Sequence, residues 1–259
     1  MQQYQDFLNQ TAPHQTYSIE SYELNGIKVW LKKSVKRHSK WLYMPVNWLA
    51  KIFRFELLIP VPNYGGALAI ECEAKRLTDL AHHGITVPKV LAISKAGLLI
   101  QDMASHDKEL MQLDHALGCE TNFEKRKALF LKACEEIKKV HQKNQYLSEA
   151  FARNILIDSN QNISFIDFET DPATVFDLKT SQTRDWLCFL FSTAFRFENH
   201  ERIEIEEIVK DYLDDYAILQ LSTLGKRFSW LNKVGVEKTG NDGKRLKIFI
   251  IFLKSLGKR

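Results

Sequence analysis

A few residues of this chain have the types and spacing that phosphoryl transfer requires. Lys32 and Lys33 end an apolar stretch, Glu73 lies in a helical pattern, Asn154 precedes one apolar run, and Asp167 follows the next. Phosphoryl transfer needs cations that hold phosphates, carboxylate and amide oxygens that hold magnesium, and a group that orients the acceptor hydroxyl. These residue types therefore indicate a candidate phosphoryl-transfer site, although each signal is weak by itself.

The first two signals concern a strand and the helix after it. Because side chains alternate along a strand, only one of Lys32 and Lys33 can face a cleft. A pattern that turns Leu31 inward also favours Lys33, so both lysines remain candidates. On the helix, Glu73 shares the apolar stripe, whereas Glu71 lies about 160° away around the axis. A carboxylate on a buried stripe needs a cationic partner, and a strand lysine is a natural one. The alternative is that these lysines and Glu73 are solvated.

The other two signals flank a second predicted hairpin. Residues 155–157 and 163–166 are expected as its strands, and the 13-residue separation of Asn154 and Asp167 brings both to one end of the pair. An amide oxygen and a carboxylate together suit magnesium. The alternative for Asp167 is a turn or cap residue.

The surrounding elements follow from periodicity and turn residues. Asn25-Gly26 suits a tight turn between strands 17–24 and 27–32. The Thr121–Glu124 segment fits a capping box that opens a helix ending near Gln142. The remaining expected elements are a short helix at 48–55, a helix at 66–83, strands at 90–93 and 98–101, a polar connector, and helices at 180–195, 203–221 and 244–255.

Taken in order, these residues resemble the signature set of the protein-kinase-like fold over about residues 17–194. Within that fold the chain is most similar to small bacterial kinases that phosphorylate Kdo or heptose sugars of the lipopolysaccharide core, and to related phosphotransferases. Residues 73–91 look like their glutamate-bearing helix and next strand, and Ile166–Glu169 looks like the magnesium motif of small-molecule kinases. Asp185-Trp186 resembles the helical aspartate that supports the catalytic loop. Only 18 residues separate it from Asp167, which argues against an ordinary protein kinase.

The resemblance implies an α+β, bilobal fold. Residues 1–103 would form a small β-rich N-lobe with one helix. Residues 104–259 would form a mainly helical C-lobe that carries the hairpin 154–167.

The resemblance also implies roles and cofactors, ATP and magnesium. Lys32, or Lys33 in its place, would hold the α- and β-phosphates, and Glu73 would orient it. Asn154 and Asp167 would bind magnesium. The adenine would lie against the residues of the lobe junction, which are Gln101, Asp102 and Met103.

Two departures from the family pattern affect activity. The catalytic loop usually has an aspartate five residues before its asparagine, and here that position is Glu149. Glu149 is either the acceptor-side base or a solvated loop residue. In addition, no glycine-rich segment precedes the strand that begins at Tyr17. A pseudokinase that binds nucleotide without turnover is therefore the alternative function.

The charge distribution suggests the partners. The chain has 259 residues and a formal net charge of +4, yet residues 221–259 hold ten Lys/Arg against two Asp/Glu, and residues 27–58 hold eight against one. By the resemblance, the acceptor would be an anionic sugar or glycolipid. Both stretches contain large apolar residues, so the segments 48–55 and 244–254 are expected either to dock at an anionic inner-membrane surface or to pack against the rest of the protein, as the helix at 244–254 would on the C-lobe. The modest total charge and the lack of a recognised motif argue against nucleic acid.

The remaining features predict the compartment. No signal peptide or spanning apolar run is visible, which predicts a cytoplasmic protein, with peripheral attachment to the inner membrane left open. The four cysteines have no metal-like spacing and are expected to be buried, reduced thiols: Cys72, Cys119, Cys134 and Cys188.

Overall fold

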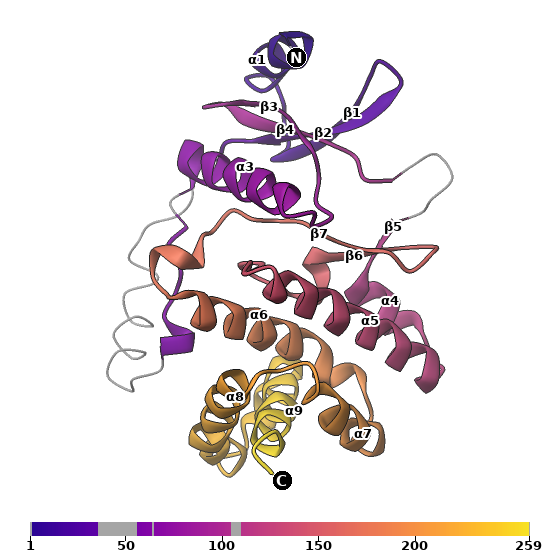
Figure 1. Ribbon diagram of the computed structural model, residues 1–259, viewed down its shortest axis with the longest axis vertical. Coiled ribbons are helices and arrows are strands. Elements are labelled where there is room, and N and C mark those ends of the chain that lie inside the picture. Colours follow the sequence, from indigo (N-terminus) through magenta and orange to yellow (C-terminus); the bar gives the residue numbers. More distant parts are fainter. Residues whose placement is uncertain (1, 36–55, 64, 105–109, 259) are drawn as a thin grey trace. The chain divides into compact units, whose positions relative to one another are not determined.

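The computed structural model describes residues 2–35, 56–63, 65–104 and 110–258 (Figure 1). The chain forms two compact units. Unit 1 comprises Met1–Leu110 and Ser164–Val175, and unit 2 comprises Met111–Ile163 and Phe176–Arg259. Helices and two small antiparallel sheets occur together, so the predicted α+β class is confirmed. The helix predicted at 48–55, and with it much of the basic stretch 27–58, lies outside the described residues.

Unit 1 is built around a four-stranded antiparallel sheet with the order β1-β2-β4-β3. Asn25 and Gly26 both have positive φ, 55° and 71°, as the predicted two-residue turn between β1 and β2 requires. In the register, Lys32 pairs with Ile19 of β1 and with Leu98 of β4. The elements of unit 1 are α1 Gln2–Thr11, β1 Ile19–Leu24, β2 Ile27–Lys33, η2 Glu56–Leu58, α3 Gly66–His82, β3 Val90–Ser94, β4 Gly97–Gln101 and η4 Pro172–Thr174.

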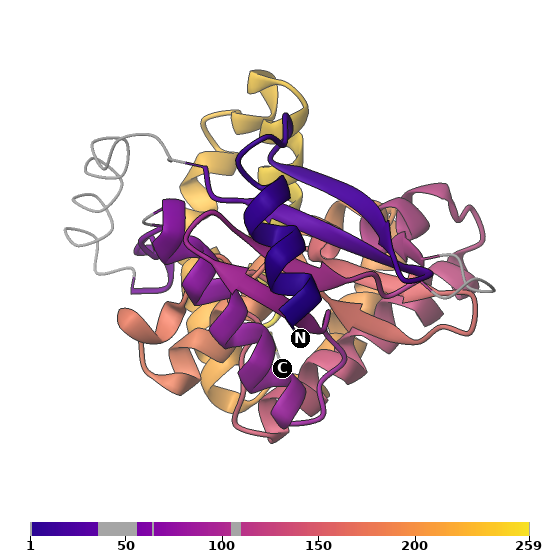
Figure 2. The ribbon, with the colours of Figure 1, turned by 90° about the horizontal axis from the view of Figure 1, so that it is seen from above.

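Helices cover both faces of this sheet. Leu8 of α1 and Ala12, which directly follows that helix, pack against Val29, Leu31 and other apolar side chains on one face, and Figure 2 shows α1 lying across the strands. The alternate residues of β2 point to the opposite face, where α3 lies. Helix α3 begins at Gly66, close to the predicted start, and is followed by Gly84 with a φ of 65°.

A second, three-stranded sheet has the order β5-β6-β7. Its strands are β5 Leu110–Gln112, β6 Ile155–Asp158 and β7 Ile163–Phe165, and the last two match the predicted hairpin. Asp158 closes the hairpin turn, because its carboxylate accepts hydrogen bonds from the backbone N–H groups of Asn160 and Asn162 at 2.9 and 2.8 Å.

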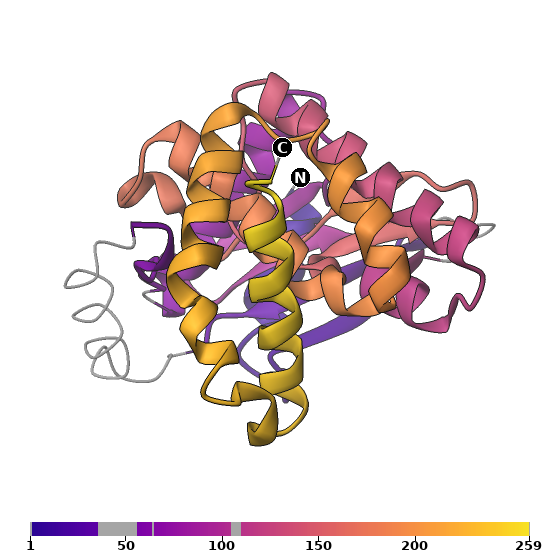
Figure 3. The same cartoon turned by 90° about the horizontal axis from the view of Figure 1, so that it is seen from below.

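Unit 2 is mainly helical. Its core stacks Phe130 of α5 on Phe189 of α6, with ring centroids 5.1 Å apart. Helices α8 and α9 pack side by side (Figure 3), and a side chain at Gly225 would clash with the backbone of Lys254. The elements of unit 2 are α4 Leu113–Cys119, α5 Phe123–Gln142, η3 Ala152–Asn154, α6 Leu178–Thr193, η5 Ala194–Arg196, α7 Asn199–Val209, α8 Asp215–Phe228, η6 Ser229–Asn232, η7 Val236–Thr239 and α9 Asn241–Ser255.

Several sequence expectations need correction. The helix predicted at 203–221 is two helices, because Asp214 caps a new one by accepting a hydrogen bond from the Ala217 N–H at 2.7 Å. The helix predicted from a capping box at Thr121 is instead capped by Asn122. The predicted polar connector contains α4, and α1 was not expected. Not all thiols are buried either, since Cys119 is exposed and Cys72 half-buried, although the four cysteines are free.

Within the described ranges, no helix combines the length and the apolar character that a membrane span requires.

Candidate functional site

The centre of the candidate site is an ion pair between β2 and α3. The Lys32 ammonium donates hydrogen bonds to both carboxylate oxygens of Glu73, at 2.8 and 2.6 Å. The Glu73 side chain is only 2% exposed and that of Lys32 15%. Glu71 is exposed, so the helical stripe correctly separated the two glutamates.

Strand alternation places the neighbouring lysine on the other face of the sheet. Lys33 donates a hydrogen bond from its Nζ to the backbone carbonyl of Gln15 at 2.8 Å, next to α1. The two lysines therefore have different partners, and Lys32 is the one that joins the carboxylates. The sequence left this choice open because it did not reveal that α1 covers the face to which Leu31 and Lys33 belong.

Two further carboxylates approach the same ammonium. Asp167 Oδ1 lies 3.5 Å and Glu169 Oε1 3.4 Å from Lys32 Nζ. Both carboxylates come from the segment 164–175, which folds as part of unit 1. Sequence reasoning selected Asp167 but gave Glu169 no role, although Glu169 closed the motif-like stretch that ends the predicted strand.

The segment that carries these carboxylates is fixed by backbone contacts. The Phe165 N–H donates to the carbonyl of Thr86 at 3.0 Å, and the Phe168 ring is fully buried. The Cys72 thiol lies 3.6 Å from the Phe168 carbonyl, which ties the segment to α3. Asp167 itself has a φ of 71°, a left-handed conformation that aspartate tolerates better than most residues.

The cluster holds more negative than positive charge. Burial lowers the pKa of Lys32, but the attraction of Glu73 and Asp167, the hydrogen bonds to Glu73 and the attraction of Glu169 together raise it. Burial raises the pKa of Glu73; Asp167 and Glu169 add to that rise, and Lys32 opposes it. The lysine therefore remains protonated, and one ammonium neutralises only part of three carboxylates.

The predicted adenine-side residues follow β4. Asp102 is engaged within the protein: its carboxylate contacts Lys28 at 3.1 Å and accepts hydrogen bonds from Trp30 Nε1 at 3.0 Å and from the Ala104 N–H at 2.7 Å. The N–H groups of Gln101 and Asp102 donate to backbone carbonyls at 2.9 Å. The Met103 N–H makes no hydrogen bond to any residue that the structure describes.

The remaining predicted residues belong to unit 2. Asn154 is 6% exposed, and its side-chain amide donates to the backbone carbonyl of Glu149 at 3.0 Å. This bond closes the loop between the two residues, and Glu149 is half-buried within it. Since Asp167 belongs to unit 1, the pairing of Asn154 with Asp167 at a magnesium ion remains a prediction.

Asp185 supports this loop from α6. Its side chain is fully buried, and its Oδ2 accepts hydrogen bonds from the Leu147 N–H at 2.7 Å and from His141 Nε2 at 2.9 Å. The sequence resemblance had singled out Asp185 for such a role.

The donor chemistry of unit 1 suits a hard cation, since Asp167 and Glu169 are partly exposed oxygen ligands, 42% and 31%. Across the described ranges, no group of three or more His, Cys, Asp and Glu residues has a metal-binding arrangement of its own. A ligand that brings phosphate oxygens would supply the missing donors. A scan against protein-family models found no matching family, and a search of curated proteins found no significant match.

Proposed function

We propose that this chain is an ATP- and magnesium-dependent phosphotransferase with a bilobal, protein-kinase-like fold. The observation that carries the proposal is the Lys32 ammonium, which is held by Glu73 and approached by Asp167 and Glu169. A buried, oriented lysine beside two partly exposed carboxylates is what a nucleotide with its metal ion requires. By resemblance, the acceptor is a sugar hydroxyl of a lipopolysaccharide-core intermediate, and the enzyme works in the cytoplasm.

Each residue then has a role. Lys32 holds the α- and β-phosphates, and Glu73 orients it. Asp167 and Asn154 would hold the magnesium ion, with Glu169 adding a carboxylate to the cluster around Lys32. Bound magnesium neutralises charge on the phosphates.

Nucleotide binding is the first test. ATP with magnesium should raise the melting temperature of the wild-type protein, because a ligand that binds only the folded state stabilises it. Lys32→Met and Asp167→Ala should abolish the shift, whereas Lys33→Met, on the other face of the sheet, should keep it. An unchanged shift in Lys32→Met and Asp167→Ala would place the nucleotide elsewhere and overturn the proposal.

A pseudokinase remains the second candidate, because a glutamate occupies the position of the usual loop aspartate. The extra methylene of Glu149 displaces its carboxylate, and misplacement of about 1 Å can cost on the order of 10²-fold in rate. Magnesium-dependent transfer of labelled γ-phosphate to a purified core-sugar acceptor, lost in Glu149→Ala while ATP binding persists, would exclude this candidate. ATP binding without transfer would support it.

A specific surface favours a membrane-associated form of either candidate. Exposed cations at the end of α8 and in the turns after it lie close in sequence to two exposed apolar side chains, Trp230 at 55% and Val234 at 66%. The cations are Lys226, Arg227 and Lys233. Exposed cationic and apolar groups in one short segment suit anionic lipid, because an aromatic ring can enter the headgroup region while the cations meet the negative charge of the lipid.

Vesicle sedimentation tests this surface. The protein should bind phosphatidylcholine vesicles that contain phosphatidylglycerol but not pure phosphatidylcholine vesicles, and added salt should weaken binding. Trp230→Ala should reduce binding, whereas Phe191→Ala, at an exposed aromatic residue of α6, should not. Equal binding to both kinds of vesicle would refute the electrostatic part of the argument.

A further inference from the structure

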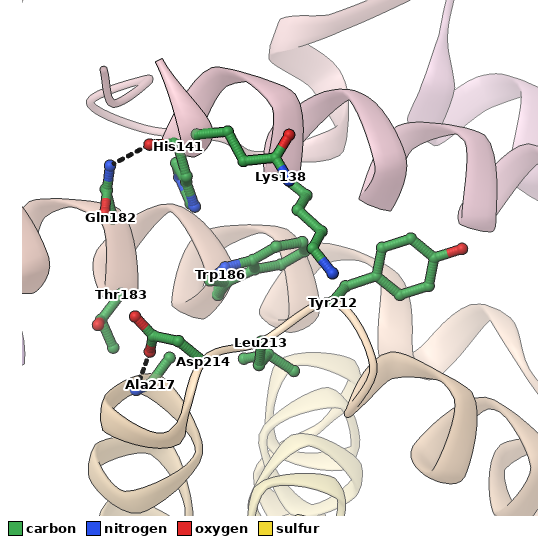
Figure 4. A pocket seen from close by; sticks show the side chains of 10 residues that line it. Lys138, His141, Gln182, Thr183, Trp186, Tyr212, Leu213, Asp214 and Ala217 are labelled. Carbon is green, nitrogen blue, oxygen red and sulfur yellow. Dashed lines mark hydrogen bonds between the residues drawn. The ribbon is translucent and has the colours of Figure 1, made fainter. Parts of the chain in front are cut away.

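Unit 2 contains a pocket that none of the proposed catalytic residues lines. It has a volume of about 350 Å³ and lies where α5, α6 and the start of α8 meet (Figure 4). This volume is at the lower end of the range of small-molecule sites. Its buried wall combines apolar side chains with one hydroxyl: Trp186 and Ala217 are each 2% exposed, Leu213 8% and Thr183 1%.

Two side chains of opposite charge, Lys138 and Asp214, line the outer part of the pocket. Figure 4 shows the Lys138 ammonium and the Asp214 carboxylate on opposite sides of the Trp186 ring. Among the described residues, neither charge takes part in an ion pair. Lys138 donates to the backbone carbonyl of Asp211 at 2.7 Å and lies 5.6 Å from the centre of the Tyr212 ring, which leaves ammonium protons for a ligand.

The Asp214 carboxylate also keeps hydrogen-bonding capacity for a ligand. Asp214 Oδ1 accepts the hydrogen bond from the Ala217 N–H that caps α8, and its other oxygen has no hydrogen-bond partner within the described part of the chain. An ionised carboxylate can accept several hydrogen bonds. A cationic group of a ligand therefore finds an acceptor on this side without disturbing the helix cap.

We propose that this pocket binds a small, elongated zwitterion: a molecule with an anionic group at one end, an amine at the other, and a flat apolar body between them. The anion meets Lys138, the amine meets Asp214, and the flat body lies against Trp186. The two charges, half-buried Lys138 and exposed Asp214, favour a ligand that meets both, because a ligand with one charge leaves the second protein charge without a counterion.

Hydrogen bonds link the pocket to the start of the loop that contains Glu149. His141 lines the pocket, and its Nε2 bonds the same Asp185 oxygen that accepts from the Leu147 N–H. Occupation of the pocket restrains His141, and through Asp185 it restrains the Leu147 amide. The pocket is therefore a regulatory site for this loop, a statement that does not depend on the reaction that the protein catalyses.

Three related probes test the charge requirement. In ligand-observed NMR titrations of the full chain, 4-(aminomethyl)benzoate should bind at least about tenfold more tightly than benzylamine or 4-methylbenzoate, each of which lacks one charge. Lys138→Met should remove the preference over benzylamine. Asp214→Asn, which keeps a helix cap of similar strength, should remove the preference over 4-methylbenzoate.

Matched controls and a second readout complete the experiment. Lys132→Met on α5 and Asp215→Asn on α8 alter neighbouring charges that do not line the pocket, so both should bind all three probes as the wild type does. The zwitterion should slow hydrogen exchange at the Leu147 amide, measured by NMR. Equal affinities for the three probes, no saturable binding, or equal losses in the control variants would overturn the proposed ligand class. Unchanged Leu147 exchange on binding would overturn its link to the loop.

Discussion

Replacing Lys32 by methionine should destabilise the protein in a way that the cluster geometry quantifies. The substitution keeps most of the aliphatic stem but removes the ammonium that Glu73 holds at 2.6 Å. Removing one partner of a buried ion pair costs about 3–5 kcal/mol, because the other charge remains buried without compensation. Lys32 keeps 15% exposure and Glu73 can take up a proton, so the lower end applies. A loss of about 3 kcal/mol corresponds to a fall of roughly 6–12 °C in melting temperature.

Urea unfolding followed by circular dichroism, together with calorimetry, measures this loss. Lys33→Met is the matched control, because it removes only one hydrogen bond to the carbonyl of Gln15 and should cost about 1 kcal/mol. The double variant Lys32→Met/Glu73→Leu should recover much of the stability, since it leaves no buried charge at position 73. Simple addition of the two single effects would refute the pairing.

The loss should also depend on pH. Burial raises the pKa of Glu73 in the folded protein, and without Lys32 this pKa should rise further. A carboxyl group with a raised folded-state pKa binds its proton more tightly in the folded than in the unfolded protein. Protonation of this group therefore stabilises the fold at low pH, and that stabilisation is lost as the pH rises. Lys32→Met should therefore be more damaging at about pH 8 than at about pH 5. Equal losses at the two pH values would contradict the assignment of Glu73 as the uncompensated group.

Other outcomes follow from single contacts. Iodoacetamide should label the exposed Cys119 well before Cys72, because burial raises the pKa of the Cys72 thiol to about 11; mass spectrometry of partly alkylated protein would show the order, and faster labelling of Cys72 would contradict it. Asp185→Ala should cost about 2–3 kcal/mol in urea unfolding, because the Leu147 N–H and the His141 imidazole both lose the carboxylate that accepts their hydrogen bonds. A near-neutral change would show that water takes the place of the carboxylate. Arg126→Met should cost about 3 kcal/mol in urea unfolding, because it removes the cation that pairs with the buried Glu201 carboxylate and leaves that carboxylate only the hydrogen bond from the Glu198 N–H. Replacing Glu201 by leucine as well should restore part of this loss, and failure to do so would show that the arginine acts through packing.

The sequence predicted those parts of the fold that local rules decide. The Asn25-Gly26 turn requires positive φ at both residues, and the structure has it. The inward stripe of α3 identified Glu73 over Glu71 because the helical period fixes which residues share a face. The hairpin around residues 158–162 followed from two apolar runs and a polar turn.

Other parts depended on tertiary packing and left little trace in the sequence. Helix α1 is mostly polar and buries only Leu8 within its own span, so its pattern did not mark it as a covering helix. Without α1, the choice between Lys32 and Lys33 could not be made. The approach of Glu169 to Lys32 depends on the path of segment 164–175, which includes the left-handed conformation of Asp167. The sequence does not indicate this conformation, because the position is not a glycine.

Helix α1 has a practical consequence for shortened forms of this protein. Val29, Leu31 and Leu99 are fully buried beneath it, and the Gln15 side chain next to it donates to the Leu31 carbonyl at 3.0 Å. A chain that begins after residue 16 would expose this row of aliphatic side chains on an open sheet, a surface that favours self-association. If such a truncated chain aggregates or is inactive, the cause would be the loss of α1 from the sheet, and the result would not test the role of Lys32.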